Sequence, residues 1–256
     1  MIYVEHISKS FGEQQVLNDI SVTFEEGKIS LIIGASGSGK TVLLKTIAGL
    51  HEVSSGTVKY DNVNFSALDA QGRKEIHQQT GMLFQGAALF DFATVEENVR
   101  FPLDFFTQWT EAQKRERVDF CLNRVRLHNA HDKFPSELSG GMQKRVGIAR
   151  AIVMNPKYLF CDEPNSGLDP QTSIVIDELI RDITHEFHMT TIVNTHDMNS
   201  VLANGEKVVF IYKGNLAWEG TNQEIFQSGC SELDDFVFAS KLAAQIRKRT
   251  PTSTLN

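Results

Sequence analysis

The sequence is poor in cysteine, and the few cysteines are not placed to form a metal site. The three of them, Cys121, Cys161 and Cys230, are far apart, odd in number and form no Cys-x-x-Cys pair. The sequence therefore indicates neither a zinc site nor a disulfide framework. A reducing compartment such as the cytosol fits this pattern, and we expect Cys161 to be a small buried hydrophobe in an apolar strand.

Long apolar runs are also missing. No run approaches the roughly 18 residues that a membrane-spanning helix requires. Residues 1–6 lack the basic stretch followed by an apolar stretch that is typical of a secretory signal. We therefore expect any role at a membrane to come through a partner protein.

An excess of positive charge is the third absence. The chain has 25 Lys and Arg against 32 Asp and Glu, and its formal net charge is −7. This balance argues against general binding to nucleic-acid backbones or to anionic lipid. The hydrophobic content of 41% is ordinary for a globular protein, and 256 residues suffice for one α/β domain with an inserted subdomain.

Strand patterns occur near both ends of the chain, and a helical pattern fills the middle. We expect strands over residues 3–7, 15–24, 28–33, 158–161, 190–195 and 208–212. The last three alternate with helical stretches, as in parallel βαβ units. We expect helices over residues 40–50 and 138–154, and helices that begin at capping boxes at residues 110–113 and 221–224.

The most specific motif follows the apolar strand at residues 28–33. It reads GASGSGKT and matches the phosphate-binding pattern GxxxxGK[ST]; its residues are Gly34, Ala35, Ser36, Gly37, Ser38, Gly39, Lys40 and Thr41. Glycines let backbone N–H groups turn toward phosphate oxygens, and the following helix adds its positive N-terminal end. Lys40 supplies a charge near the β- and γ-phosphates, and Thr41 offers a hydroxyl to Mg²⁺.

Two adjacent carboxylates, Asp162 and Glu163, end a second apolar strand. Burying both is unfavourable unless a cation compensates their charge. We expect Asp162 to serve a Mg²⁺ ion, while Glu163 faces the γ-phosphate and orients or deprotonates a water molecule. Alone, this pair would indicate only the start of a surface loop; the phosphate loop makes the functional interpretation the better one.

Residues 138–142 read LSGGM and open an amphipathic helix. Here the sequence resembles the ATP-binding cassette family, in which an LSGGQ signature of one subunit caps the nucleotide held by the other. The hydroxyl of Ser139, the open backbone of Gly140 and Gly141 and a helix N-terminus suit an anion. Since the chain already has one phosphate loop, this second anion site implies a dimer that holds a pair of ATP molecules with Mg²⁺.

The other landmarks of the family follow in order along residues 1–227. By resemblance, Phe11 stacks on adenine, and Gln85 contacts Mg²⁺ or water and senses the transporter. Residues 165–169 are similar to the D-loop, whose Asp169 we include in the nucleotide site. His196 matches the switch histidine that contacts the γ-phosphate, so Glu163, His196 and Gln85 are the expected catalytic residues. Thr41, Gln85 and Asp162 are the expected metal-binding residues.

The resemblance implies an α/β fold: a P-loop NTPase core of ABC type with an N-terminal antiparallel β subdomain and an inserted α-helical subdomain. We expect one ATPase domain over residues 1–228, with its helical part over about 86–155, and a tail over 229–256. The tail could reach a second subunit, but a solvated and partly frayed end is the preferred interpretation.

The signature ending in Met142 and the stretch LFQGAALF at residues 83–90 resemble ATPases of the Mla and MCE type, which serve bacterial phospholipid trafficking. This implies an MlaE-like permease partner, a possible MCE-domain protein in the same complex, and a position at the inner face of the cell membrane. Two alternatives stay open: an ATPase for import of a small polar solute, such as an amino acid or ion, and a non-transport cassette protein. A kinase of small metabolites is rejected, because the signature helix and His196 have no role in it.

Overall fold

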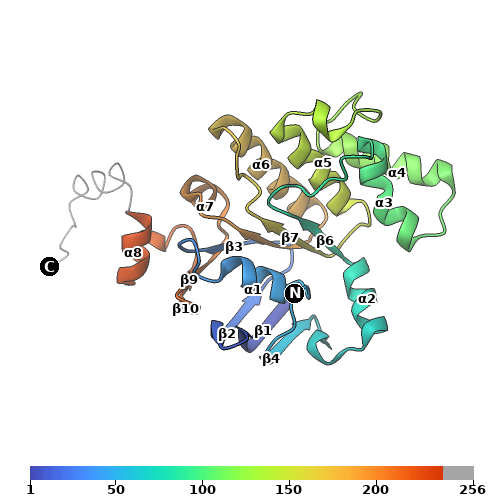
Figure 1. Cartoon of the computed structure of the whole chain (residues 1–256). Helices are drawn as coiled ribbons and strands as arrows, with labels where there is room; N and C mark the ends of the chain where they lie inside the picture. Colours follow the sequence, from blue (N-terminus) through green and yellow to red (C-terminus); the bar gives the residue numbers. More distant parts are fainter. Residues whose placement is uncertain (239–256) are drawn as a thin grey trace.

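The computed structural model describes residues 1–238 as two β-sheets with helices packed around them (Figure 1). The smaller sheet is antiparallel, in the order β2-β1-β4-β5. Its strands are β1 (Ile2–Phe11), β2 (Gln14–Phe24), β4 (Ser55–Tyr60) and β5 (Val63–Asn64). One face of this sheet lies on the core, and Ile2, Val4 and Phe24 are buried there.

The larger sheet has six strands in the order β10-β9-β3-β8-β7-β6. They are β3 (Ile29–Ile33), β6 (Thr80–Leu83), β7 (Tyr158–Asp162), β8 (Thr190–Asn194), β9 (Lys207–Tyr212) and β10 (Asn215–Gly220). All neighbours are parallel except the β9–β10 pair. Every residue of β3, β7 and β8 is buried, and β3 and β7 accordingly read as almost continuous apolar runs.

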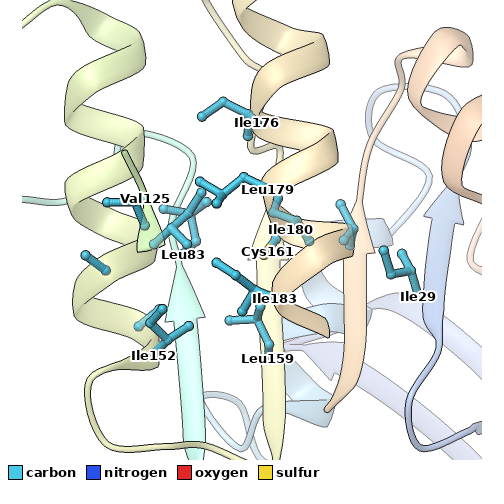
Figure 2. Packing of buried hydrophobic residues seen from close by; sticks show 14 of the residues in the cluster. Ile29, Leu83, Val125, Ile152, Leu159, Cys161, Ile176, Leu179, Ile180 and Ile183 are labelled. Atoms are coloured by element: carbon cyan, nitrogen blue, oxygen red, sulfur yellow. The ribbon is translucent and has the colours of Figure 1, made fainter. Parts of the chain in front are cut away.

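Helices cover both faces of the larger sheet. They are α1 (Lys40–Ile47), α2 (Ala70–Gln78), α3 (Val95–Phe106), α4 (Glu111–Arg124), α5 (Gly140–Ile152), α6 (Pro170–Glu186), α7 (Met198–Asn204) and α8 (Ser231–Val237). On one face, the apolar side of α6 with Ile176 and Ile183 packs over β7 (Figure 2). On the other face, α1 and the antiparallel sheet close a second core. The predicted fold class is confirmed.

The predicted helix over residues 40–50 is too long, because α1 ends at Ile47. Gly49 has φ +78° and donates to the carbonyl of Thr46, while the N–H of Leu50 donates to the carbonyl of Lys45. These bonds form the left-handed termination that glycine favours after a helix. Leu50, the last residue of the predicted helix, is consequently 48% exposed.

Only one half of the predicted capping box at residues 221–224 forms, and no α-helix follows it directly: the N–H of Glu224 donates to the backbone carbonyl of Thr221 instead of its hydroxyl. The N–H of Thr221 donates to the carboxylate of Glu224 over 2.7 Å, yet only a single 3₁₀ turn, Ile225–Gln227, comes next. The side chain of Asn222 donates to the carbonyl of Leu202, which ties this segment to α7. The Thr221–Glu224 contact therefore closes a turn and does not cap an α-helix.

The expectation of a solvated tail is wrong for its first part. Helix α8 buries Leu233 and Val237 in the core beneath the sheet, and Phe236 lies 5.6 Å from Phe210 between ring centroids. The remaining predicted tail, residues 239–256 with the basic run at 247–249, lies outside the described residues. Within residues 1–238, no helix has both the length and the apolarity to cross a lipid bilayer.

The packing of α8 gives a stability prediction. Leu233 has no exposed surface, so Leu233→Ala removes buried methyl groups and leaves a cavity. We expect the free energy of unfolding to fall by about 2–4 kcal/mol, measured by urea denaturation. Glu232→Ala on the solvent side of the same helix is the control, and equal stability of both variants and the unmodified chain would show that α8 does not belong to the core.

Candidate nucleotide-binding site

The phosphate loop at residues 34–39 connects β3 to α1 at the carboxyl edge of the larger sheet. Gly34 and Gly39 have φ angles of +149° and +107°. A Cβ atom at Gly34 would lie 2.3 Å from the carbonyl oxygen of Ile211, and one at Gly39 would lie 2.9 Å from Leu17. Glycine is therefore required at both positions for the loop to lie against its neighbours.

Lys40 crosses the loop from the first turn of α1. Its Nζ donates to the carbonyls of Gly34 and Ala35 over 2.9 and 3.1 Å, and the side chain is almost fully buried. Burial lowers the pKa of Lys40, and the charges of Glu163 and Asp162 oppose this effect. The hydroxyl of Ser38 is buried in the same loop and has no hydrogen-bond partner in the described residues. The loop thus offers a buried ammonium and a free hydroxyl donor, which suits a polyphosphate.

Thr41, Asp162 and Asn194 form a closed triangle of hydrogen bonds beneath the loop. The hydroxyl of Thr41 donates to Asp162 Oδ1 over 3.2 Å, and the amide of Asn194 donates to both of these groups, over 2.9 and 2.7 Å. Carboxylate and hydroxyl oxygens are the ligands that Mg²⁺ prefers. Thr41 and Asp162 therefore fit the predicted metal site.

Glu163 and His196 form the next layer of the site. Glu163 Oε2 lies 2.6 Å from His196 Nδ1, and the histidine ring is mostly exposed, with a side-chain exposure of 65%. Glu163 has φ +51°, an uncommon conformation for a residue with a side chain. Its N–H donates to the carbonyl of Asn194 over 2.9 Å. Glu163, which directly follows β7, is thus held by a hydrogen bond of its backbone N–H, and its carboxylate is paired with His196.

Gln85 is exposed, and its side chain contacts the D-loop. Its side-chain amide donates to the hydroxyl of Ser166 over 3.2 Å. No hydrogen bond within residues 1–238 joins Gln85 to Thr41 or Asp162. The structure therefore brings together Thr41 and Asp162 of the predicted metal residues, and it places Gln85 beside the D-loop.

Helix α5 holds the loop around Gln85 by hydrogen bonds from two basic side chains. The Lys144 ammonium donates to the carbonyl of Gln85 and, over 3.4 Å, to that of Glu163. Arg150 donates to the carbonyls of residues 87 and 88 over 2.6 and 2.9 Å. Burial lowers the pKa of Lys144. These basic residues, which the sequence places beside the apolar stripe of the helix, therefore hold the Gln85 loop against α5.

Ser139 caps the N-terminus of α5. Its hydroxyl accepts from the N–H of Met142 over 3.3 Å, and both Ser139 and Gly140 are exposed. A Cβ atom at Gly141 would lie 2.5 Å from Thr172 Cγ2. The signature thus lies beside the first turn of α6 and presents a polar helix terminus to solvent.

Asp169 caps α6 in a similar way. Its carboxylate accepts from the N–H groups of Gln171 and Thr172 and from the Thr172 hydroxyl. These hydrogen bonds lower its pKa, led by the Thr172 hydroxyl. The side chain of Asp169 is therefore engaged by its own helix.

Phe11 lies exposed at the end of β1. The ring is 45% exposed, the Nζ of Lys9 lies 4.8 Å from its centroid, and His51 contacts it edge-on at 5.4 Å. An exposed aromatic ring held from two sides can accept a flat heterocycle by stacking.

The comparison with known families agrees with this geometry. Residues 17–166 match the family model described as ABC transporter, which covers more than half of the chain. The chain belongs to this family.

Solved ATP-binding cassettes have the same fold as this cassette. One is described as the dimeric, post-hydrolysis state of the cassette MJ0796 bound to ADP and Pi; it has 31% sequence identity and a TM-score of 0.79, over 87% of this chain and 99% of that one. Another is cbiO1 from Clostridium perfringens, part of the transporter complex cbiONQ, with 29% identity and a TM-score of 0.83 over 96% and 98% of the two chains.

Curated relatives of the cassette have different names. The probable ribonucleotide transport ATP-binding protein mkl of Mycobacterium tuberculosis is 35% identical over 227 residues, which are 89% of this chain and 63% of the relative. The methionine import ATP-binding protein MetN of Clostridioides difficile is 37% identical, over 88% of this chain and 70% of the relative. The cassette thus spans less than two thirds of the length of the mkl relative.

Two parts of this cassette's site are absent from the sequence-based prediction. One is Asn194, whose signal is a polar side chain at the end of an apolar strand. The other is a network in which Asp177 accepts from Asn165 over 2.8 Å and from Ser200 over 2.7 Å. Burial raises the pKa of Asp177. This network joins the D-loop to α7, and three residues so far apart in the chain give no local pattern.

Proposed function

We propose that this cassette is the ATP-hydrolysing subunit of a membrane transporter and that it takes ATP with Mg²⁺. The observation that carries the proposal is the meeting of three elements at one sheet edge. The buried Lys40 lies on the phosphate loop, Thr41 and Asp162 share a hydrogen bond, and Glu163 lies 2.6 Å from His196.

The residues of this site have separate roles in the proposed reaction. Lys40 and the N–H groups of the loop bind the β- and γ-phosphates and stabilise charge that develops on them. Glu163 accepts a proton from the attacking water or orients it, and His196 holds the Glu163 carboxylate in place. Thr41 and Asp162 would hold the metal ion, which neutralises phosphate charge when bound. Phe11 stacks on the adenine.

The proposed working unit is a homodimer. Ser139 and Gly140 are exposed at the N-terminus of α5, where free N–H groups attract an anion. The hydrogen bonds of Ser139 and Asp169 run to their own helices in the single chain. A second subunit that brings its own phosphate loop to this surface would complete the site, with Gly141 and Asp169 near the shared nucleotide.

The proposed cargo is lipid, and the proposed partner is an MlaE-like permease, with an MCE-domain protein possible in the same complex. A cluster of aromatic residues, the phenylalanine patch, lies next to the Gln85 loop and comprises Phe90, Phe92, Phe101, Phe105 and Phe106. Phe92 and Phe105 are 83% and 72% exposed. Such a patch supports a docking surface for an apolar helix of the permease. The cassette would then lie on the cytoplasmic side of the cell membrane.

A second candidate is import of a small polar solute, which the similarity to the MetN relative favours. The ATPase chemistry would be identical, so only the permease and its cargo distinguish the two. A non-transport cassette is less well supported, because the described residues contain no zinc-type cysteine group and the chain is acidic.

Co-expression with the MlaE-like permease of the same organism tests this proposal. We expect the two proteins to purify together with bound phospholipid. Phe92→Glu should abolish the co-purification, because it places a charge on the most exposed ring of the phenylalanine patch. Phe120→Glu is the matched control, since Phe120 is also exposed but lies on α4 outside the phenylalanine patch. Co-purification with a solute permease that carries no phospholipid, together with ATP hydrolysis by that complex, would favour import of a small polar solute.

A further inference from the structure

Asn194 is a buried polar residue at the centre of the site, and the phosphate-loop and carboxylate motifs do not include it. It is the last residue of β8 and has no exposed surface. In the sheet, β8 lies between β3 and β7; Asn194 pairs with Ile32 on one side and with Asp162 on the other. Its side chain is therefore placed between the strand that leads to the phosphate loop and the strand that leads to Glu163.

The hydrogen bonds of Asn194 fix its orientation. An ionised carboxylate only accepts hydrogen bonds, so the group that faces Asp162 Oδ1 must be the amide nitrogen. The two hydrogens of this nitrogen account for both contacts, to Asp162 Oδ1 and to Thr41 Oγ1. The amide oxygen is buried and has no partner in the described residues. Asparagine at this position is thus used for its two donors.

These donors decide which lone pairs remain free for a cation. The Thr41 hydroxyl donates its hydrogen to Asp162 and accepts from Asn194, so one of its two lone pairs stays available. Asp162 Oδ1 accepts two hydrogen bonds, whereas Oδ2 accepts none from residues 1–238. The hydrogen bonds therefore orient Thr41 Oγ1 and Asp162 Oδ1. One lone pair of the Thr41 hydroxyl and the Oδ2 atom of Asp162 remain free to bind a metal ion.

We infer that Asn194 is a positioning residue for the Mg²⁺ site: its amide holds Thr41 and Asp162 in the arrangement that binds the metal ion. The inference rests on the proposed function, and it adds a residue that acts through the metal ligands rather than on the nucleotide. The carbonyl of Asn194 also accepts from the N–H of Glu163, so a single residue links the phosphate loop, the metal carboxylate and the backbone of the catalytic glutamate.

Asn194→Val tests the role of the side chain, because it removes both donors and leaves the backbone carbonyl in place. Partners that orient metal ligands typically contribute about 10- to 100-fold in metal affinity. We therefore expect the Mn²⁺ concentration for half-saturation, measured by electron paramagnetic resonance with ATP present, to rise by at least about tenfold. Binding of a fluorescent ATP analogue in EDTA should stay unchanged, because Lys40 and the loop are intact. Asn194→Thr keeps one donor, so its Mn²⁺ concentration for half-saturation should lie between those of the unmodified chain and Asn194→Val.

Thr190→Val is the matched control. Thr190 lies at the other end of β8, is buried, and also has a side-chain oxygen without a partner. It should leave both affinities unchanged. An unchanged Mn²⁺ midpoint in Asn194→Val, or an equal loss of ATP-analogue binding in EDTA, would overturn the inference. If the unmodified chain binds neither ATP nor Mn²⁺ with ATP, the proposed function itself fails, which is a separate result.

Discussion

Glu163→Gln is expected to stop ATP turnover and to leave ATP binding intact. The substitution keeps the shape of the side chain but removes its ability to take a proton from water. A positioned general base contributes about 10²- to 10⁴-fold to a rate, so phosphate release should fall by a factor in this range. Lys40, Thr41 and Asp162 do not depend on the Glu163 carboxylate for their hydrogen bonds. The affinity for a fluorescent ATP analogue should therefore stay within about twofold, since the charged contacts to phosphate persist.

The same variant should also trap the dimer, because nucleotide that is not hydrolysed keeps the subunits together. Size-exclusion chromatography with ATP and Mg²⁺ should show a dimer that EDTA dissociates. Lys40→Ala is the contrasting control: it removes the charge that we propose contacts phosphate, and this variant should lose nucleotide binding and the dimer together. Phosphate release near the unmodified rate in Glu163→Gln would remove Glu163 from the catalytic role.

Six of the ten strands and the phosphate loop were predictable from sequence because their signals are local; the strands β4, β5, β6 and β10 were not predicted. Apolar runs such as β3 and β7 are long enough to read as buried strands, and the glycine pattern of the loop depends on adjacent residues. The hairpin of β9 and β10 also depends on adjacent residues, namely the two residues of its turn, although the strand pattern alone does not predict it. Lys213 and Gly214 have φ angles of +48° and +79°, which is the geometry of a two-residue turn with both angles positive.

Other parts of the structure depend on partners distant in sequence. Helix α8 is short, and only its packing against Phe210 and the sheet explains why Leu233 is buried. Asn194 reads as an ordinary polar residue until the sheet order places it between β3 and β7. The family resemblance assigns Ser139 and the phosphate loop to one nucleotide, and this assignment also depends on a partner that no local pattern shows. Ser139 lies at an exposed helix end and has no recorded hydrogen bond to the phosphate loop within residues 1–238.

Ser139→Arg is expected to inactivate the site of the other subunit rather than its own. A long cation at this exposed helix end blocks the surface that we propose faces the partner's nucleotide. The test combines Ser139→Arg with Glu163→Gln in mixed dimers made from two differently tagged chains. With the changes on opposite chains, one complete site remains, formed by the intact Glu163 of one chain and the intact Ser139 of the other. With both changes on one chain and an unmodified partner, each shared site carries one defect.

The opposite-chain dimer should therefore hydrolyse ATP faster than the same-chain dimer, by at least about tenfold if loss of the base sets the difference. A site built within a single chain predicts the reverse order, since the unmodified partner would then keep its own complete site. Ser139→Ala controls for the helix cap: it removes the hydrogen bond to the N–H of Met142 and lowers helix stability by about 1 kcal/mol, but it adds no bulk. Equal phosphate release from both mixed dimers, or a faster same-chain dimer, would contradict a nucleotide shared between two subunits.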